Sequence, residues 1–193
     1  MKKQQKKIIS ICVWSAVALF AVRCAISWKS IVTGVTVYDL FGYAGEAISI
    51  AVIFTGFYEK LLWRINPFEK TPKLSKRYVG SLKSSYDNLE REAVLEIRQT
   101  LMSVHITLTS AESKSKSLSA SIDEILGEMQ LTYCYLNTPK SEFRHRSEVH
   151  YGTAMLSITN PTSLEGQYYT DRKTTGDMVF TMDKPLRSAQ TTR

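Results

Sequence analysis

Cysteine and histidine are scarce in this sequence, with three of each among 193 residues. Cys12 and Cys24 fall in an apolar N-terminal run and Cys134 falls in a stretch of alternating polarity, so no disulfide framework is expected and a reducing cytoplasm suits the chain. The histidines have no cysteine or carboxylate cluster at metal-ligand spacing. We therefore expect neither a structural disulfide nor a metal site.

The common catalytic motifs are also missing. There is no G-x-x-x-x-G-K-[ST] phosphate loop and no G-x-G-x-x-G. Residues 113–116 (SKSK) match S-x-x-K and residues 173–176 (KTTG) resemble K-T-G, but a polar hairpin in a small domain is the wrong context for a penicillin-recognising serine enzyme. Asp123 and Glu124 are adjacent in a predicted strand, so they point to opposite faces. The sequence predicts a protein that is not an enzyme.

Basic residues are in excess overall, with 25 Lys and Arg against 18 Asp and Glu and a net charge of +7. From Arg64 onward the balance is 18 to 15, a net of only +3. This small excess excludes a simple polybasic surface for nucleic-acid polymers, although a local pocket can still be positive.

Two long hydrophobic runs dominate the N-terminal third. Residues 8–28 carry one charge, Arg23, and residues 44–63 are charged only at Glu46, Glu59 and Lys60. Each run has the roughly 20 residues that cross a hydrocarbon core about 30 Å thick. A signal peptide is the alternative for the first run, since MKKQQKK is a suitable charged start. No clean small-x-small cleavage pattern follows, so we favour two transmembrane helices.

The basic residues around these runs predict the topology. Those that precede the first run or end and follow the second are Lys2, Lys3, Lys6, Lys7, Lys60, Arg64, Lys70, Lys73, Lys76 and Arg77. The loop between the runs has only Lys29. The positive-inside rule therefore places both termini in the cytoplasm and makes the chain a multi-pass membrane protein.

Arg23 and Glu46 both fall near the outer ends of the predicted membrane helices. An unpaired charge deep in lipid is costly. Two arrangements relieve that cost: the side chains approach each other, or each extends separately to the interface.

The remaining chain alternates in polarity with a period of two. Met102, Val104, Ile106 and Leu108 alternate with polar residues, which is typical of a half-buried strand. Seven or eight such stretches follow a connector marked by Asn66-Pro67 and Thr71-Pro72. So many short strands must hide their edges, which favours a closed antiparallel barrel. A single helical turn is also predicted over residues 89–93, after Asp87-Asn88.

The predicted fold is a membrane-anchored all-β protein, with two N-terminal transmembrane helices followed by a small antiparallel β-barrel of about eight strands. The predicted boundaries are a basic cytoplasmic N-terminus at 1–7, transmembrane helices at 8–28 and 44–63 joined by a periplasmic loop at 29–43, a linker at 64–73, the barrel at 74–184 and a flexible tail at 185–193.

This architecture resembles the effectors of CBASS anti-phage immunity that are associated with CD-NTases and sense their ligand with a minimal β-barrel. The likeness is carried by residues 74–86 (LSKRYVGSLKSSY) and 164–180 (LEGQYYTDRKTTGDMVF), a closing hairpin of the G-x-Y-x-T/S-x-R kind in which the pattern tyrosine is Tyr168 or Tyr169. The resemblance implies that a cyclic dinucleotide binds the barrel and that the protein then forms a homo-oligomer. The resemblance further implies that the helices then disrupt the lipids of the bacterial inner membrane, with both termini and the barrel in the cytoplasm, and that abortive infection follows. No further cofactor is implied.

The resemblance also implies ligand contacts in and near this hairpin. The predicted residues are Arg172 and Lys173 for phosphate charge, Tyr169 and Tyr78 for base stacking, Thr170 or Thr174 for hydrogen bonds, and, in second rank, Arg98 and Tyr133. Core filling is the alternative role for any of the tyrosines. Two other functions stay open: a membrane-anchored barrel that binds a lipid or apolar metabolite, and a platform for protein interaction without a small ligand.

Overall fold

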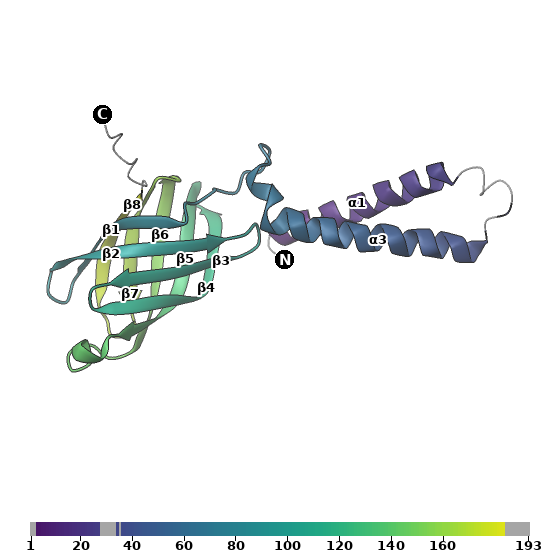
Figure 1. Ribbon diagram of the computed structural model, residues 1–193. Helices are drawn as coiled ribbons and strands as arrows, with labels where there is room; N and C mark the ends of the chain where they lie inside the picture. Colours follow the sequence, from purple (N-terminus) through teal and green to yellow (C-terminus); the bar gives the residue numbers. More distant parts are fainter. Residues whose placement is uncertain (1–2, 28–33, 35, 184–193) are drawn as a thin grey trace, which may run out of the picture. The chain divides into compact units, whose positions relative to one another are not determined.

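The computed structural model describes residues 3–27, 34 and 36–183 (Figure 1). It divides into two compact units, Met1–Glu69 with Thr100–Met102, and Lys70–Gln99 with Ser103–Arg193. The predicted tail at 185–193 and most of the first half of the predicted loop at 29–43 lie outside the described residues.

The first unit contains two helices, α1 (Lys3–Ile26) and α3 (Val37–Lys60), followed by the 3-10 turn η1 (Leu62–Arg64). Both helices are long and apolar enough to cross a membrane. Helix α3 begins at a capping box, in which the Thr36 hydroxyl accepts from the backbone N–H of Asp39 and the Asp39 carboxylate accepts from the backbone N–H of Thr36. Its buried residues recur every three or four positions, so they form one face, and α1 packs against α3.

The two charged residues Arg23 and Glu46, one from each apolar run, meet between these helices. The Nε of Arg23 lies 3.1 Å from Oε2 of Glu46, and the guanidinium lies 4.3 Å from the centre of the Tyr43 ring. Arg23 also donates to the hydroxyl of Ser27 at 2.5 Å. Of the two arrangements expected from the sequence, the paired one is confirmed.

The second unit is a closed antiparallel barrel in which β1 pairs with both β2 and β8 (Figure 1). The strands are β1 (Arg77–Ser84), β2 (Glu90–Gln99), β3 (Val104–Ser110), β4 (Ser113–Ile125), β5 (Glu128–Pro139), β6 (His150–Asn160), β7 (Ser163–Thr170) and β8 (Thr175–Met182), with a 3-10 turn η2 (Ser141–Phe143) before β6. The predicted barrel of about eight antiparallel strands is therefore confirmed.

Alternate residues of each strand fill the barrel interior. Leu95, Leu131, Leu156 and Phe180 are all fully buried there. The helical turn predicted over residues 89–93 is wrong, because β2 begins at Glu90 and pairs on both sides, with β1 and β3. Cross-strand pairing and the burial of alternate residues outweigh the local signal for a helix start.

The barrel has two distinct ends. The connections β1–β2, β3–β4, β5–β6 and β7–β8, residues 85–89, 111–112, 140–149 and 171–174, lie at one end, which we call the mouth. The chain enters β1 at the opposite end. There the Gln99 side chain accepts from the backbone N–H of Leu74 at 3.0 Å and donates to the carbonyl of Pro72 at 2.8 Å. Gln99 thus ties the incoming linker to the barrel wall.

Candidate ligand pocket at the barrel mouth

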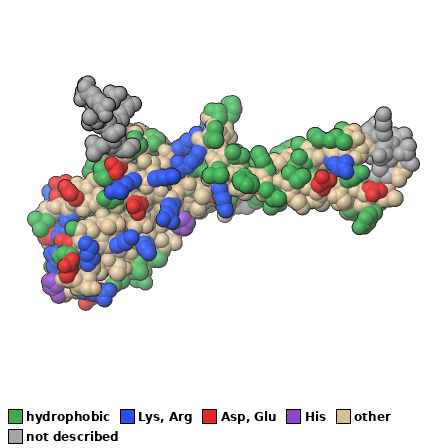
Figure 2. All heavy atoms as spheres, in the orientation of Figure 1, with side chains coloured by type: hydrophobic (Ala, Val, Ile, Leu, Met, Phe, Trp, Pro, Cys, Tyr) green, Lys and Arg blue, Asp and Glu red, His purple; other side chains and the backbone are tan. Residues whose placement is uncertain are grey.

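A cavity of about 270 Å³ opens in the barrel mouth. Interior residues near the mouth ends of the strands form its walls and floor, and residues of the four mouth connections or their edges form its rim. Basic and acidic side chains are mixed over this end of the barrel (Figure 2). The pocket therefore combines a closed β wall with a charged entrance.

Two tyrosines form an aromatic wall. Tyr135 on β5 and Tyr168 on β7 line the cavity, and their cross-strand partners are Gly152 and Gly176. A Cβ at Gly152 would overlap the Tyr135 ring, and a Cβ at Gly176 would overlap the Tyr168 ring. Glycine at these positions lets each ring lie across the neighbouring strand. Burial raises the pKa of Tyr135 well above its ordinary value, so its hydroxyl is neutral.

A row of buried polar groups on β4, β5 and β6 lies on the pocket wall, on the mouth side of Tyr135. The hydroxyl of Ser115 donates to Oδ1 of Asn137 at 3.0 Å, and Nδ2 of Asn137 lies 3.3 Å from Nε2 of His150. The Nδ1 of His150 lies 2.9 Å from the carbonyl of Glu148, which can only accept, so Nδ1 carries the proton and Nε2 accepts from Asn137. Burial lowers the pKa of His150, in agreement with this neutral form.

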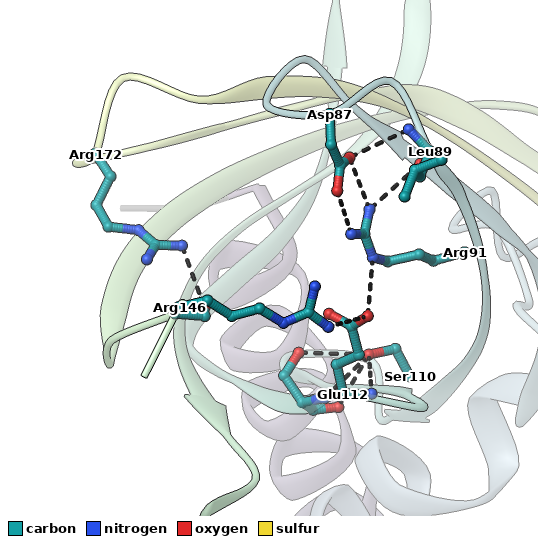
Figure 3. A network of polar contacts seen from close by, with 9 residues as sticks. Asp87, Leu89, Arg91, Ser110, Glu112, Arg146 and Arg172 are labelled. Atoms are coloured by element: carbon teal, nitrogen blue, oxygen red, sulfur yellow. Dashed lines mark hydrogen bonds and ion pairs between the residues drawn. The ribbon is translucent and has the colours of Figure 1, made fainter. Parts of the chain in front are cut away.

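The rim carries a network of arginines and carboxylates (Figure 3). Arg91, at the start of β2, binds the Asp87 carboxylate through both terminal nitrogens, and its Nε lies 3.4 Å from Oε1 of Glu112. The same Glu112 oxygen lies 2.8 Å from Nη2 of Arg146. The hydrogen bonds from Arg91 and then from the Leu89 backbone lower the pKa of Asp87 to about 2. At neutral pH the Asp87 carboxylate is therefore charged.

A third arginine reaches the pocket from the β7–β8 connection. Arg172 donates to the hydroxyl of Ser147 at 3.4 Å (Figure 3). The connection itself is held by Thr170 and Thr174, whose hydroxyl oxygens are 2.6 Å apart, and Lys173 takes the left-handed conformation with φ 62°. The turn thus directs Arg172 into the pocket lining and leaves Lys173 exposed outside it.

The residues predicted from the sequence divide into two groups. Arg172, Thr170 and Thr174 line the pocket together. The other predicted residues do not: Lys173, Tyr169 and Arg98 are exposed outside the lining, while Tyr78 and Tyr133 are buried in the barrel interior. The Tyr78 hydroxyl donates to the Pro161 carbonyl at 2.6 Å, which gives this ring a structural partner at the end opposite the mouth.

Side chains along a strand alternate between the inner and the outer face, and this strand parity points to two pocket residues that the predicted set omitted, Arg91 and Tyr168. Leu95 and Ile97 face inward on β2, so Arg91 shares their face and Arg98 lies on the other. On β7, Leu164 faces inward, so Tyr168 rather than Tyr169 points into the barrel. Arg146 and Glu112 lie in connections, where periodicity gives no such signal.

A closed barrel with an arginine-rimmed pocket, in a chain with two helices of membrane length, is the architecture of a ligand-binding domain joined to a pair of apolar helices. Residues 69–182 match the family described as Cap15, cyclic dinucleotide receptor domain. The chain is also 30% identical over 182 residues to CD-NTase-associated protein 15 of Staphylococcus schleiferi, and the alignment covers 92% of this chain and 97% of that protein. The chain therefore belongs to the Cap15 cyclic dinucleotide receptor family, and the resemblance found in the sequence is confirmed.

Proposed function

We propose that this protein is a membrane-bound effector of an anti-phage signalling system and that its mouth pocket binds a cyclic dinucleotide. The observation that carries the proposal is the convergence of Arg91, Arg146 and Arg172 on one pocket walled by two tyrosines. Guanidinium groups recognise phosphate oxygens, and flat rings stack on bases. Family membership supports the same ligand class.

The pocket geometry suggests a division of roles. Arg172 binds one phosphodiester of the cyclic dinucleotide, and Arg91 and Arg146 bind the other. Tyr135 and Tyr168 offer faces for the bases. The Asn137 amide on the pocket wall has a second N–H and a second lone pair with which to read a base edge.

The expected response is assembly in the membrane. In our proposal both termini and the barrel are cytoplasmic, as the lysines flanking the helices favour, and α1 and α3 span the inner membrane. The ligand must favour an oligomer over the free form, because it shifts an equilibrium only by its different affinities for the two states. The assembled helices then disrupt the bilayer, and the infected cell dies.

The lipid-binding alternative requires an apolar cavity. The pocket wall instead carries the hydrogen-bonded row of Ser115, Asn137 and His150, and the rim carries charged groups. Burying an apolar ligand against these groups would remove their access to water without giving them new partners. The pocket therefore favours a polar, anionic ligand.

The test is calorimetric titration of the full chain in lipid nanodiscs with a panel of cyclic dinucleotides. Arg172→Ala should weaken binding roughly 10- to 150-fold, because it removes a charge-assisted hydrogen bond worth about 1.5–3 kcal/mol. Lys114→Ala is the matched control, since Lys114 lies beside the mouth on β4 with its side chain exposed outside the pocket. The affinity of Lys114→Ala for the cyclic dinucleotide should equal that of the wild type.

Failure of the wild-type chain to bind any cyclic dinucleotide at micromolar concentration would overturn the proposal and favour the protein-interaction platform. Equal affinities for Arg172→Ala and the wild type would place the ligand elsewhere on the barrel. Chemical crosslinking in the same nanodiscs, with and without ligand, tests the oligomer separately.

A further inference from the structure

Glu112 occupies a special position in the rim network. A single carboxylate oxygen of Glu112 contacts both Arg146, at 2.8 Å, and Arg91, at 3.4 Å (Figure 3). Arg172, by contrast, donates to the neutral hydroxyl of Ser147. Two of the three arginines of the pocket are thus already neutralised by a carboxylate before any ligand arrives.

The backbone holds Glu112 firmly in this place. Its N–H donates to the hydroxyl of Ser110 at 3.3 Å, and its carbonyl accepts from the N–H of Lys140 at 2.9 Å. The connection that carries it has only residues 111–112 between β3 and β4. The Glu112 side chain is 30% exposed, so its carboxylate has water beside it when it leaves the arginines.

We propose that Glu112 is an internal counter-ion that a phosphodiester of the ligand displaces, so that it sets the ligand concentration at which the receptor responds. A phosphodiester carries one negative charge on two free oxygens, as a carboxylate does, and can form the same ion pairs with Arg91 and Arg146. Binding of the ligand to these two arginines exchanges one anion for another, which makes the net free energy of binding less favourable. The inference rests on the proposed function, because it assigns the regulation of the same pocket.

The exchange has a structural consequence at the mouth. Arg146 belongs to the connection 140–149, and its guanidinium stacks on Phe143 of the same segment at 4.9 Å. Glu112 and Arg172 both hold this segment from the facing rim, through Arg146 and Ser147. A ligand that binds both Arg146 and Arg172 replaces these contacts with its own.

Glu112→Gln separates this role from simple support of the rim. Glutamine keeps the length of the side chain and an accepting oxygen but removes the charge. If Glu112 only supports the rim, the variant loses stability and gains no affinity. If Glu112 competes with the ligand, the variant binds anions more tightly.

The experiment titrates the full chain in nanodiscs with two probes, the cyclic dinucleotide panel and inorganic pyrophosphate. We expect Glu112→Gln to tighten binding of both about tenfold, the effect of removing one nearby like charge from a partly buried site. Glu124→Gln, an exposed carboxylate on β4 outside the pocket, should change neither affinity. In an Arg146→Ala background the gain from Glu112→Gln should shrink, because the two residues act as a pair.

The outcomes separate this inference from the proposed function. Equal dinucleotide affinities in the wild type and Glu112→Gln overturn the inference and leave the function standing. No dinucleotide binding by either chain, with tighter pyrophosphate binding by Glu112→Gln, overturns the function and supports the counter-ion role. If Glu112→Gln is destabilised and melts at a lower temperature, Glu112→Asp is the alternative variant. Its side chain is shorter by one methylene, so its carboxylate lies further from the arginines. We then expect a gain in affinity smaller than tenfold. No gain in that variant would also overturn the inference.

Discussion

Replacing Gly152 with alanine tests whether the aromatic wall is built around a glycine. The new Cβ would lie 2.9 Å from Cε2 of Tyr135 and closer still to the tip of its ring. The ring is the part able to move, because β6 is paired with both β5 and β7. The ring lines the cavity, and the cavity offers it space. We therefore expect Gly152→Ala to fill part of the pocket.

Gly166→Ala is the matched control on the next strand. Its Cβ would meet backbone, with the Leu156 Cα and the Met155 carbonyl carbon both at 2.9 Å. No side chain is available to yield there, so the strands themselves must separate. Overpacking costs about 1–3 kcal/mol, and we place Gly152→Ala near the lower limit and Gly166→Ala near the upper one.

The two variants should therefore rank in opposite order in two assays. For a domain of this size about 1 kcal/mol lowers the Tm by roughly 3–6 °C, so Gly166→Ala should melt about 10–15 °C early and Gly152→Ala only about 5 °C early. Gly152→Ala should lose most of the dinucleotide affinity, while folded Gly166→Ala should retain it. Near-UV circular dichroism and calorimetry measure the two quantities. Unchanged affinity in Gly152→Ala would refute the proposed aromatic wall.

Two further predictions concern charge. Burial, with a smaller contribution from the nearby Arg172, lowers the pKa of His150 from its ordinary value of 6.5, although the hydrogen bond to the Glu148 carbonyl and, less, Asp171 oppose the shift. Below pH 6.5 the unfolded chain therefore binds a proton that the folded chain does not, so the Tm should fall with acidification. In melts between pH about 8 and about 5, His150→Gln should reduce the dependence of the Tm on pH. For the Arg23–Glu46 pair, R23E or E46R alone should lower the melting temperature of the helical signal in bilayers, and the double variant should restore it. Failure of the double variant to recover would refute a stabilising role for the pair.

The barrel was predictable because its strands repeat one simple rule. Alternate residues of β8 such as Met178 and Phe180 are buried while Asp177 and Val179 are exposed, as the alternation in the sequence predicts. The number of strands follows from the number of such stretches. The misread turn after Asp87 shows the limit of local signals, because the carboxylate that resembles a helix start instead binds Arg91 and the Leu89 N–H.

The candidate site was predictable only in part. Parity assigns a residue to the inner or outer face, but not to a depth along the barrel. Tyr133 and Tyr135 share the inner face of β5, yet only Tyr135 lines the pocket, because it lies two residues nearer the mouth. The depth at which a residue sits depends on the stagger between strands, and the stagger is set by closure of the whole sheet.

Closure also explains why the charged rim could not be assembled from the sequence. Arg91, Glu112, Arg146 and Arg172 belong to four separate segments, and only the ring order of the strands brings those segments to one end. Once they meet there, the carboxylates are as informative as the arginines. If Glu112 is displaced by a phosphodiester as proposed, a ligand must offer enough additional contacts to outcompete this carboxylate at Arg91 and Arg146. Discrimination of this kind is what a receptor needs if abundant cellular nucleotides are not to trigger it.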